Sequence, residues 1–164
     1  MFTIRHNNMQ LKLAIVALMA AFTLAFGSMV RAQPVSTLQV HASSSIESAW
    51  MAMQQGDFKH AIHLNKRALR GNLSTAQRVI AYNNLCVSLH MEGQLLAATE
   101  ACTSAIQLDR NYWQAYNNRA NVAFDSEDYV LAERDYDAAL RLQPGEDAIV
   151  TNLKLVRQLS ASLD

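Results

Sequence analysis

Apolar and small side chains recur at intervals of three, four and seven residues through most of the chain after residue 44. Tyr82, Cys86 and Leu89 show this spacing. It places side chains on one face of a helix, because an α-helix completes a turn every 3.6 residues, whereas a strand would show a period of two. The pattern therefore predicts seven helices, at about residues 45–55, 57–70, 76–92, 94–108, 112–126, 129–142 and 147–160.

Turn-forming residues separate the predicted helices. Residues 55–57, 71–75 and 144–145 contain the glycines and a proline that favour breaks in a helix. The three serines at 43–45 offer hydroxyl groups that can cap the first helix. Residues 33–42 lack the helical period, so we predict that they form a short lead-in segment.

The chain also repeats itself with a period of 34 residues. The segment Tyr82-Asn83-Asn84 returns as Tyr116-Asn117-Asn118. Three later positions return with the same offset: Ala98 as Ala132, Ala105 as Ala139 and Leu108 as Leu142. A period of this length is typical of helical repeat arrays. Such arrays display an extended surface, which favours binding over catalysis as the function.

These repeated residues resemble the tetratricopeptide repeat, a helix-turn-helix unit of 34 residues with small side chains at its eighth and twentieth positions. One stretch carries the pattern most fully, with Trp113, Tyr116, Ala120, Asp128, Tyr129, Ala132, Tyr136, Ala139 and the final Pro144. The preceding stretch carries Tyr82, Leu85, Gly93, Ala98, Ala105 and Asp109, although Arg110 stands where a proline is usual. An earlier, degenerate stretch aligns with an offset of 37, pairing Gly56 with Gly93, Ala61 with Ala98 and Ala68 with Ala105.

The resemblance covers about residues 43–162 and implies an all-α fold, a right-handed solenoid of about three helix-turn-helix units. The units are predicted at residues 43–75, 79–112 and 113–146. A capping helix is expected at residues 147–162, where Val150, Asn152 and Leu153 repeat the positions of Tyr116, Asn118 and Arg119 but no partner helix follows.

In this family the first helices of successive units line a concave groove, so the resemblance also predicts which side chains face a partner. They are Ile46, Trp50, Met53, Gln54, Ile80, Asn83, Asn84, Val87, His90, Met91, Gln114, Asn117, Asn118, Asn121, Phe124, Asp125 and Asn152. Asn84, Asn118 and Asn152 occupy one repeat position. An amide both donates and accepts hydrogen bonds, so this ladder of asparagines could hold the main chain of an extended peptide. The alternative is that the amides satisfy groups inside the scaffold.

One subclass of the family binds the C-terminal carboxylate of a chaperone through lysines and an arginine. This chain has Ile46, Gln114 and Asn118 at three of the matching positions, which excludes such a carboxylate clamp. The first half of the predicted groove is instead apolar and could accept hydrophobic side chains at Trp50, Met53, Ile80, Val87 and Met91. Alternatively, residues 33–42 fold back and cover it.

The N-terminal segment is typical of a secretory signal peptide. Arg5 and Lys12 precede an apolar run over residues 13–30, and Val30-Arg31-Ala32 suits a signal peptidase, so we expect cleavage after Ala32. The prediction is an exported protein in a bacterial periplasm. The alternative is a retained membrane anchor at residues 13–30, which is long enough to span a bilayer at the lower limit.

Composition excludes one class of partner. The 164-residue chain has no net charge, and 51% of its residues are hydrophobic while 17% are charged. Loss of residues 1–32 removes three basic side chains and leaves a net charge near −3. Nucleic-acid binding requires a basic surface, so it is not expected.

Cys86 and Cys102 lie at equal distances from Gln94, beside the predicted turn between two antiparallel helices. In an oxidising compartment a disulfide would close a 16-residue span and contribute about 3 kcal/mol. The equally weighted alternative is two small reduced core residues, because disulfide geometry requires Cα atoms within roughly 7 Å.

The chain contains no glycine-rich phosphate loop, paired Cys-x-x-Cys motif, His-Glu-x-x-His helix or Gly-x-Ser-x-Gly elbow. His60 and His63 share a helix edge but lack a third ligand, so a metal site is not expected. The acidic side chains of the third unit are interpreted as mostly solvent-facing.

Together these features predict a non-catalytic protein, without cofactor, that binds a polypeptide as an adaptor or assembly factor in the cell envelope. The alternative is a membrane-anchored or self-associating scaffold whose groove is not the main contact.

Overall fold

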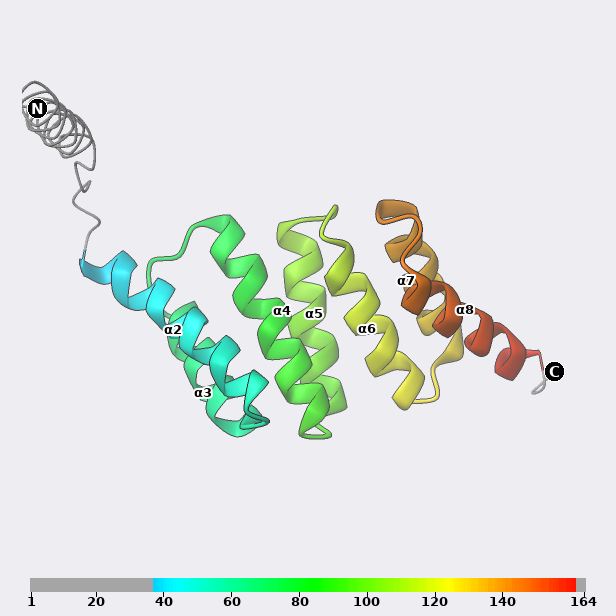
Figure 1. Cartoon of the computed structure of the whole chain (residues 1–164), viewed down its shortest axis with the longest axis horizontal. Helices are drawn as coiled ribbons and strands as arrows, with labels where there is room; N and C mark the ends of the chain where they lie inside the picture. Colours follow the sequence, from blue (N-terminus) through cyan, green and yellow to red (C-terminus); the bar gives the residue numbers. More distant parts are fainter. Residues whose placement is uncertain (1–36, 162–164) are drawn as a thin grey trace, which may run out of the picture. The chain divides into compact units, whose positions relative to one another are not determined.

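A computed structural model of the protein describes residues 37–161, with side chains from Ser44 onward. These residues form seven α-helices and no strand: α2 (Thr37–Gln54), α3 (Phe58–Leu69), α4 (Thr75–Met91), α5 (Leu95–Leu108), α6 (Trp113–Asp125), α7 (Tyr129–Leu142) and α8 (Asp147–Ser160). Figure 1 shows the helices arrayed one after another from α2 to α8. The predicted all-helical repeat solenoid is confirmed. The expected signal segment lies outside the described residues.

Helices pair with their neighbours in sequence, and the pairs then stack. The contacts of α2 with α3, α4 with α5 and α6 with α7 build the pairs, while α3 contacts α4 and α5 contacts α6. The first helices also touch one another, because α4 contacts both α2 and α6. This arrangement leaves the first helices side by side along one face of the solenoid (Figure 1).

Small side chains make the close pairing possible. Ala61, Ala98 and Ala132 occupy equivalent positions in the second helices of the three pairs, and each is completely buried. Cys86 and Ala120 provide the small partners on the first helices of the second and third pairs, and are equally inaccessible. Helix axes can approach closely only where the side chains between them are small.

The last helix covers the end of the array. Ile149, Leu153 and Val156 of α8 pack against the buried core of the third pair, which includes Ala120 and Tyr136. Without α8 this apolar surface would face water, so the helix acts as a cap.

Helix α2 begins earlier than its sequence suggests. It starts at Thr37, so most of the predicted non-helical lead-in over residues 33–42 is helical instead. The serines that were expected to cap this helix lie inside it. The Ser48 hydroxyl donates to the Ser44 carbonyl at 2.7 Å, and Arg67 donates to the Ser45 hydroxyl at 3.1 Å. Hydroxyl groups that form such bonds within and between helices do not need to end one.

The turns inside the pairs share a left-handed residue. Gly56 and Gly93 occupy equivalent positions and have φ angles of +76° and +71°. In the third pair the same position holds Glu127, at φ 60°. Left-handed backbone suits glycine and is unfavourable for a residue with a Cβ atom, so the third turn is the most strained of these three.

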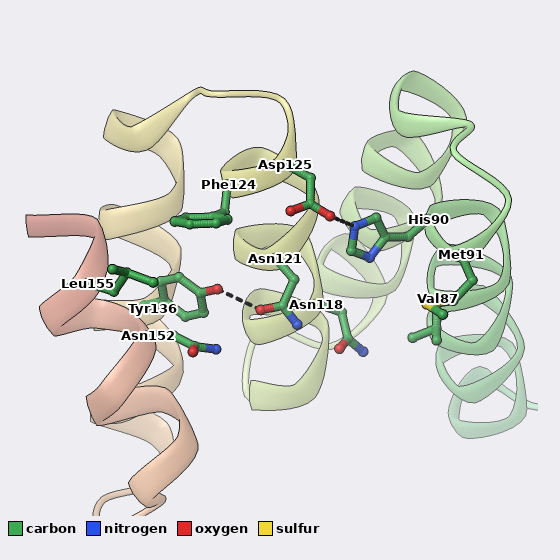
Figure 2. A pocket seen from close by; sticks show the side chains of 10 residues that line it. All are labelled: Val87, His90, Met91, Asn118, Asn121, Phe124, Asp125, Tyr136, Asn152 and Leu155. Carbon is green, nitrogen blue, oxygen red and sulfur yellow. Dashed lines mark hydrogen bonds and ion pairs between the residues drawn. The ribbon is translucent and has the colours of Figure 1, made fainter. Parts of the chain in front are cut away.

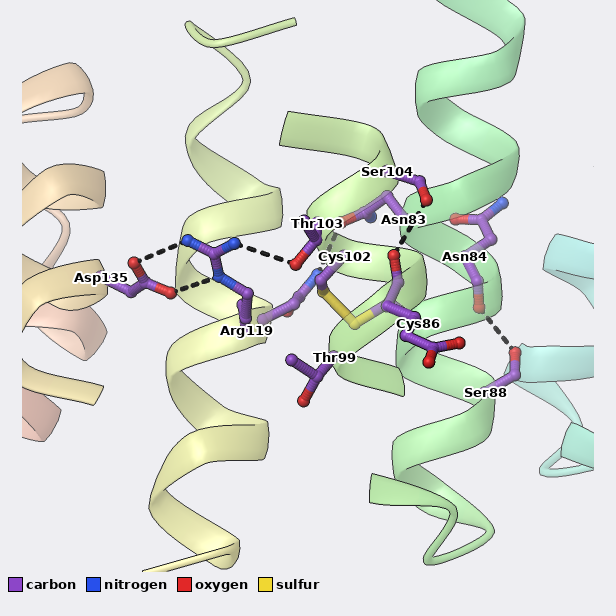
Figure 3. Close-up of a disulfide and its surroundings, with 12 residues drawn as sticks. Asn83, Asn84, Cys86, Ser88, Thr99, Cys102, Thr103, Ser104, Arg119 and Asp135 are labelled. Atoms are coloured by element: carbon purple, nitrogen blue, oxygen red, sulfur yellow. Dashed lines mark hydrogen bonds and ion pairs between the residues drawn. A yellow bond between two sulfur atoms is a disulfide. The ribbon is translucent and has the colours of Figure 1, made fainter. Parts of the chain in front are cut away.

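A buried ion pair links three helices. Asp135 of α7 is 1% exposed and receives two hydrogen bonds from Arg119 of α6, at 2.6 and 3.0 Å. The same guanidinium donates to the hydroxyl of Thr103 in α5 at 3.0 Å (Figure 3). Asp135 therefore departs from the interpretation of the acidic residues as solvent-facing. Removing one partner of such a pair costs about 3–5 kcal/mol, because the other charge stays buried and uncompensated.

Cys86 and Cys102 form a disulfide between α4 and α5, with their Cα atoms 5.2 Å apart (Figure 3). Both residues are completely buried. The cross-link joins the two helices of the central pair near the middle of each helix.

We expect this disulfide to stabilise the protein through its 16-residue span. Replacement of both cysteines by alanine should lower the free energy of unfolding in urea by about 3 kcal/mol, since the cross-link restricts the unfolded chain. Alanine keeps a small apolar side chain at each position, and a Thr99→Ala variant controls for a substitution beside the bond. Peptide mapping without reductant should recover the two cysteines in one linked fragment. Two free thiols in the purified protein would contradict the assignment.

Candidate functional site

A pocket of about 360 Å³ opens on the face formed by the first helices, between α4, α6 and α8. Figure 2 shows side chains from these helices and from α7 converging on it. The lining residues are Val87, His90, Met91, Asn118, Asn121, Phe124, Asp125, Tyr136, Asn152 and Leu155. The pocket thus combines apolar side chains with three amides and one carboxylate.

Two short hydrogen bonds hold polar side chains of the pocket in place. The His90 Nε2 atom lies 2.6 Å from Oδ2 of Asp125 and joins α4 to α6. The Tyr136 hydroxyl donates to Oδ1 of Asn121 at 2.6 Å and joins α7 to α6 (Figure 2). These bonds hold side chains from different helices in fixed positions before any ligand arrives, which reduces the entropy lost on binding.

The three asparagines of the ladder do not all line the pocket. Asn118 and Asn152 line the pocket, whereas the buried Asn84 does not. Asn118 also donates to Oδ1 of Asn83 at 2.9 Å, so part of its hydrogen-bonding capacity joins α6 to α4. Among the described residues no group donates to Oδ1 of Asn118, so this oxygen remains available to a ligand.

Several predicted groove residues lie elsewhere. Trp50 is exposed on α2, Met53 and Asn117 are partly buried, and none of the three lines this pocket. The structure brings together eight of the predicted groove residues, namely Val87, His90, Met91, Asn118, Asn121, Phe124, Asp125 and Asn152.

Sequence reasoning missed Tyr136 and Leu155. Leu155 stands 34 residues after Asn121, which itself stands 34 after Val87, so its repeat position was a usable signal. Tyr136 belongs to a second helix, where the equivalent residue of the previous unit is Cys102. Its aromatic ring is large enough to pass between α6 and α8 and reach the pocket (Figure 2).

The environment of Tyr136 keeps its hydroxyl protonated. Burial raises the pKa of Tyr136 to about 12, the amide of Asn152 opposes this shift, and the negative charge of Asp125 adds to it. The residue is 2% exposed. Tyr136 therefore remains a neutral hydrogen-bond donor throughout the physiological range.

No group of three or more potential metal ligands comes together within residues 37–161. His60 and His63 are exposed on α3. The pocket contains groups suited to hydrogen bonding and apolar contact.

We expect the raised pKa of Tyr136 to appear in the pH dependence of stability. An unfolded tyrosine titrates near 10. The unfolded state therefore loses a proton that the folded state keeps, and the contribution of Tyr136 is complete below pH 10 and is lost as the pH rises toward 12.

A Tyr136→Phe variant should be less stable than the parent at pH 9, and the difference should shrink by about 2 kcal/mol by pH 11.5. The measurement is urea unfolding across this range. Tyr129→Phe is the control, because it removes one phenol hydroxyl from a different tyrosine. A difference that stays constant with pH would contradict the raised pKa.

Comparisons with known proteins agree with this architecture. Residues 113–146 match the tetratricopeptide repeat family. A DnaJ homolog subfamily C member 7 homolog from Dictyostelium discoideum is 36% identical over 73 residues, covering 44% of this chain and 14% of that protein. The mouse DnaJ homolog subfamily C member 7 is 35% identical over 89 residues, covering 52% of this chain and 18% of the relative. The matches thus span less than a fifth of the length of these curated relatives.

A solved structure described as the first tetratricopeptide domain of Spaghetti (RPAP3) bound to the HSP90 peptide SRMEEVD aligns with a TM-score of 0.70. It is 21% identical, and the alignment covers 75% of this chain and 98% of that one. Residues 113–146 are therefore a tetratricopeptide repeat, and the helices around them give the described part of the chain the tetratricopeptide-repeat fold.

Proposed function

We propose that the protein binds an extended polypeptide segment in the groove formed by α4, α6 and α8, and that it acts as an adaptor or assembly factor. The observation that carries this proposal is the pocket itself, where amides from two repeat positions lie between apolar walls. Amides can bond to main-chain groups of any sequence, and the apolar walls can hold individual side chains.

The exposure of the apolar walls supports the same function. Met91 and Leu155 are large hydrophobic residues that remain exposed at the pocket. A soluble repeat protein gains little from apolar side chains in this position unless a partner covers them. The Spaghetti domain, of similar fold, is described as bound to a peptide, which supports a polypeptide as the ligand class.

We further propose that residues 1–32 are a signal peptide and that the protein acts in an exported compartment, the periplasm of a bacterium. The disulfide between Cys86 and Cys102 supports this, because such bonds persist mainly in oxidising compartments. Within residues 37–161 no helix has both the length and the apolarity needed to cross a bilayer. The alternative anchor at residues 13–30 lies outside the described part of the chain.

Replacement of two exposed pocket residues by alanine tests the binding function. A Met91→Ala/Leu155→Ala variant should lose polypeptides that the parent captures from an extract of the host, since both side chains line the pocket. Leu96→Ala/Val130→Ala is the matched control: these two side chains are also large, apolar and exposed, but they belong to the second helices α5 and α7. The control should keep the captured polypeptides. Equal capture by all three proteins would show that the binding site lies outside the groove.

Intact mass of the protein recovered from its host tests the export proposal. Cleavage after Ala32 should leave a mature chain that begins at Gln33, found in the periplasmic fraction. A protein that retains residues 1–32 in the membrane fraction would support the anchored scaffold instead.

A further inference from the structure

The pocket has a carboxylate at one end and no permanent cation. Asp125 has a side chain that is 54% exposed, and only its Oδ2 atom is paired, with His90. None of the ten lining residues is a lysine or arginine. The nearby basic residues of α8, Lys154 and Arg157, line a different hollow. Arg157 is moreover bound to Glu133 and Asp137 of α7.

One neutral group of the pocket also offers an acceptor for hydrogen bonds. The oxygen of Asn118 has no donor among the described residues, while its nitrogen is engaged by Asn83. Tyr136 is neutral, so the negative charge among the lining residues comes from Asp125. His90 directs a ring nitrogen at Asp125, and in its neutral form it donates a proton there and leaves the carboxylate charge in place.

The pocket also has apolar walls. Figure 2 shows Val87 and Met91 on the α4 side, with Phe124 and Leu155 on the opposite side. A long basic side chain could lay its aliphatic stem between these walls and place its charged end at Asp125. A guanidinium or ammonium group consists of donors alone and suits the carboxylate of Asp125 as an acceptor.

From this geometry we propose that the groove selects a polypeptide segment carrying a lysine or arginine, whose side chain enters the pocket and pairs with Asp125. This inference rests on the proposed function and names its ligand class. The preference is opposite in sign to the acidic peptide SRMEEVD named for the Spaghetti domain.

The test uses three end-blocked heptapeptides that differ only at the central residue, which is arginine, norleucine or glutamate. Binding to the purified protein is followed by NMR, through the side-chain amide signals of the pocket asparagines. The titrations are made at pH 8, above the range in which histidine ordinarily carries a charge. The arginine peptide should bind about fivefold more tightly than the norleucine peptide, the gain expected from a partly exposed ion pair, and the glutamate peptide should bind most weakly.

Asp125→Asn should remove the advantage of the arginine peptide, so that the variant binds the arginine and norleucine peptides with equal affinity. Glu100→Gln removes the same charge from an exposed residue of α5, and it should keep the preference. In the unmodified protein the preference should also shrink between 50 and 500 mM salt, because salt screens exposed charge pairs. This salt series remains decisive even if the Asp125 variant does not fold.

Equal affinity for the arginine and norleucine peptides, or a preference that survives Asp125→Asn, would overturn the charge selection but leave the groove as the binding site. If no peptide shifts the pocket signals at millimolar concentration, the proposed binding function fails together with this inference.

Discussion

Close approach of paired helices is the constraint on which the rest of the structure depends. Ala61, Ala98 and Ala132 allow each second helix to lie directly against its partner. A larger side chain at any of these positions would push the pair apart and disturb the stacking of the next one. Because each pair packs closely and in the same way, the first helices align on one face. The pocket forms where α4, α6 and α8 meet.

Polar contacts fix the relative positions of helices that apolar packing brings together. The Arg119–Asp135 pair fixes α6 against α7, and Thr103 extends it to α5. On the other face, the bond from Asn118 to Asn83 joins successive first helices, as does the contact of His90 with Asp125. Groups that would receive a ligand therefore also hold neighbouring repeats together, so binding and the geometry of the solenoid are coupled.

Departures from exact repetition complete the pocket. A strictly repeated unit would offer the same surface at each step, but Tyr136 replaces the small residue found at Cys102, and Leu155 replaces the amide of Asn121. The aromatic ring closes the space between α6 and α8, and the leucine supplies an apolar wall. These two residues thus complete a pocket whose remaining lining comes from first-helix positions of the repeat.

The 34-residue period and the spacing of small residues determined the fold from the sequence alone, because a helix pair with alanine-sized contacts has few ways to stack. Eight of the pocket residues followed from the resemblance to the tetratricopeptide repeat, which places the first helices of successive units along a groove. Local signals failed where long-range contacts prevailed: the serines before Ile46 suggested the start of a helix, and Asp135 suggested a solvated charge. Only the tertiary structure decided that Arg119 would meet Asp135, that Asn118 would divide its bonds between scaffold and groove, and that Tyr136 would reach the pocket. Each of these outcomes depends on the distance between helices, which emerges when the whole array has packed.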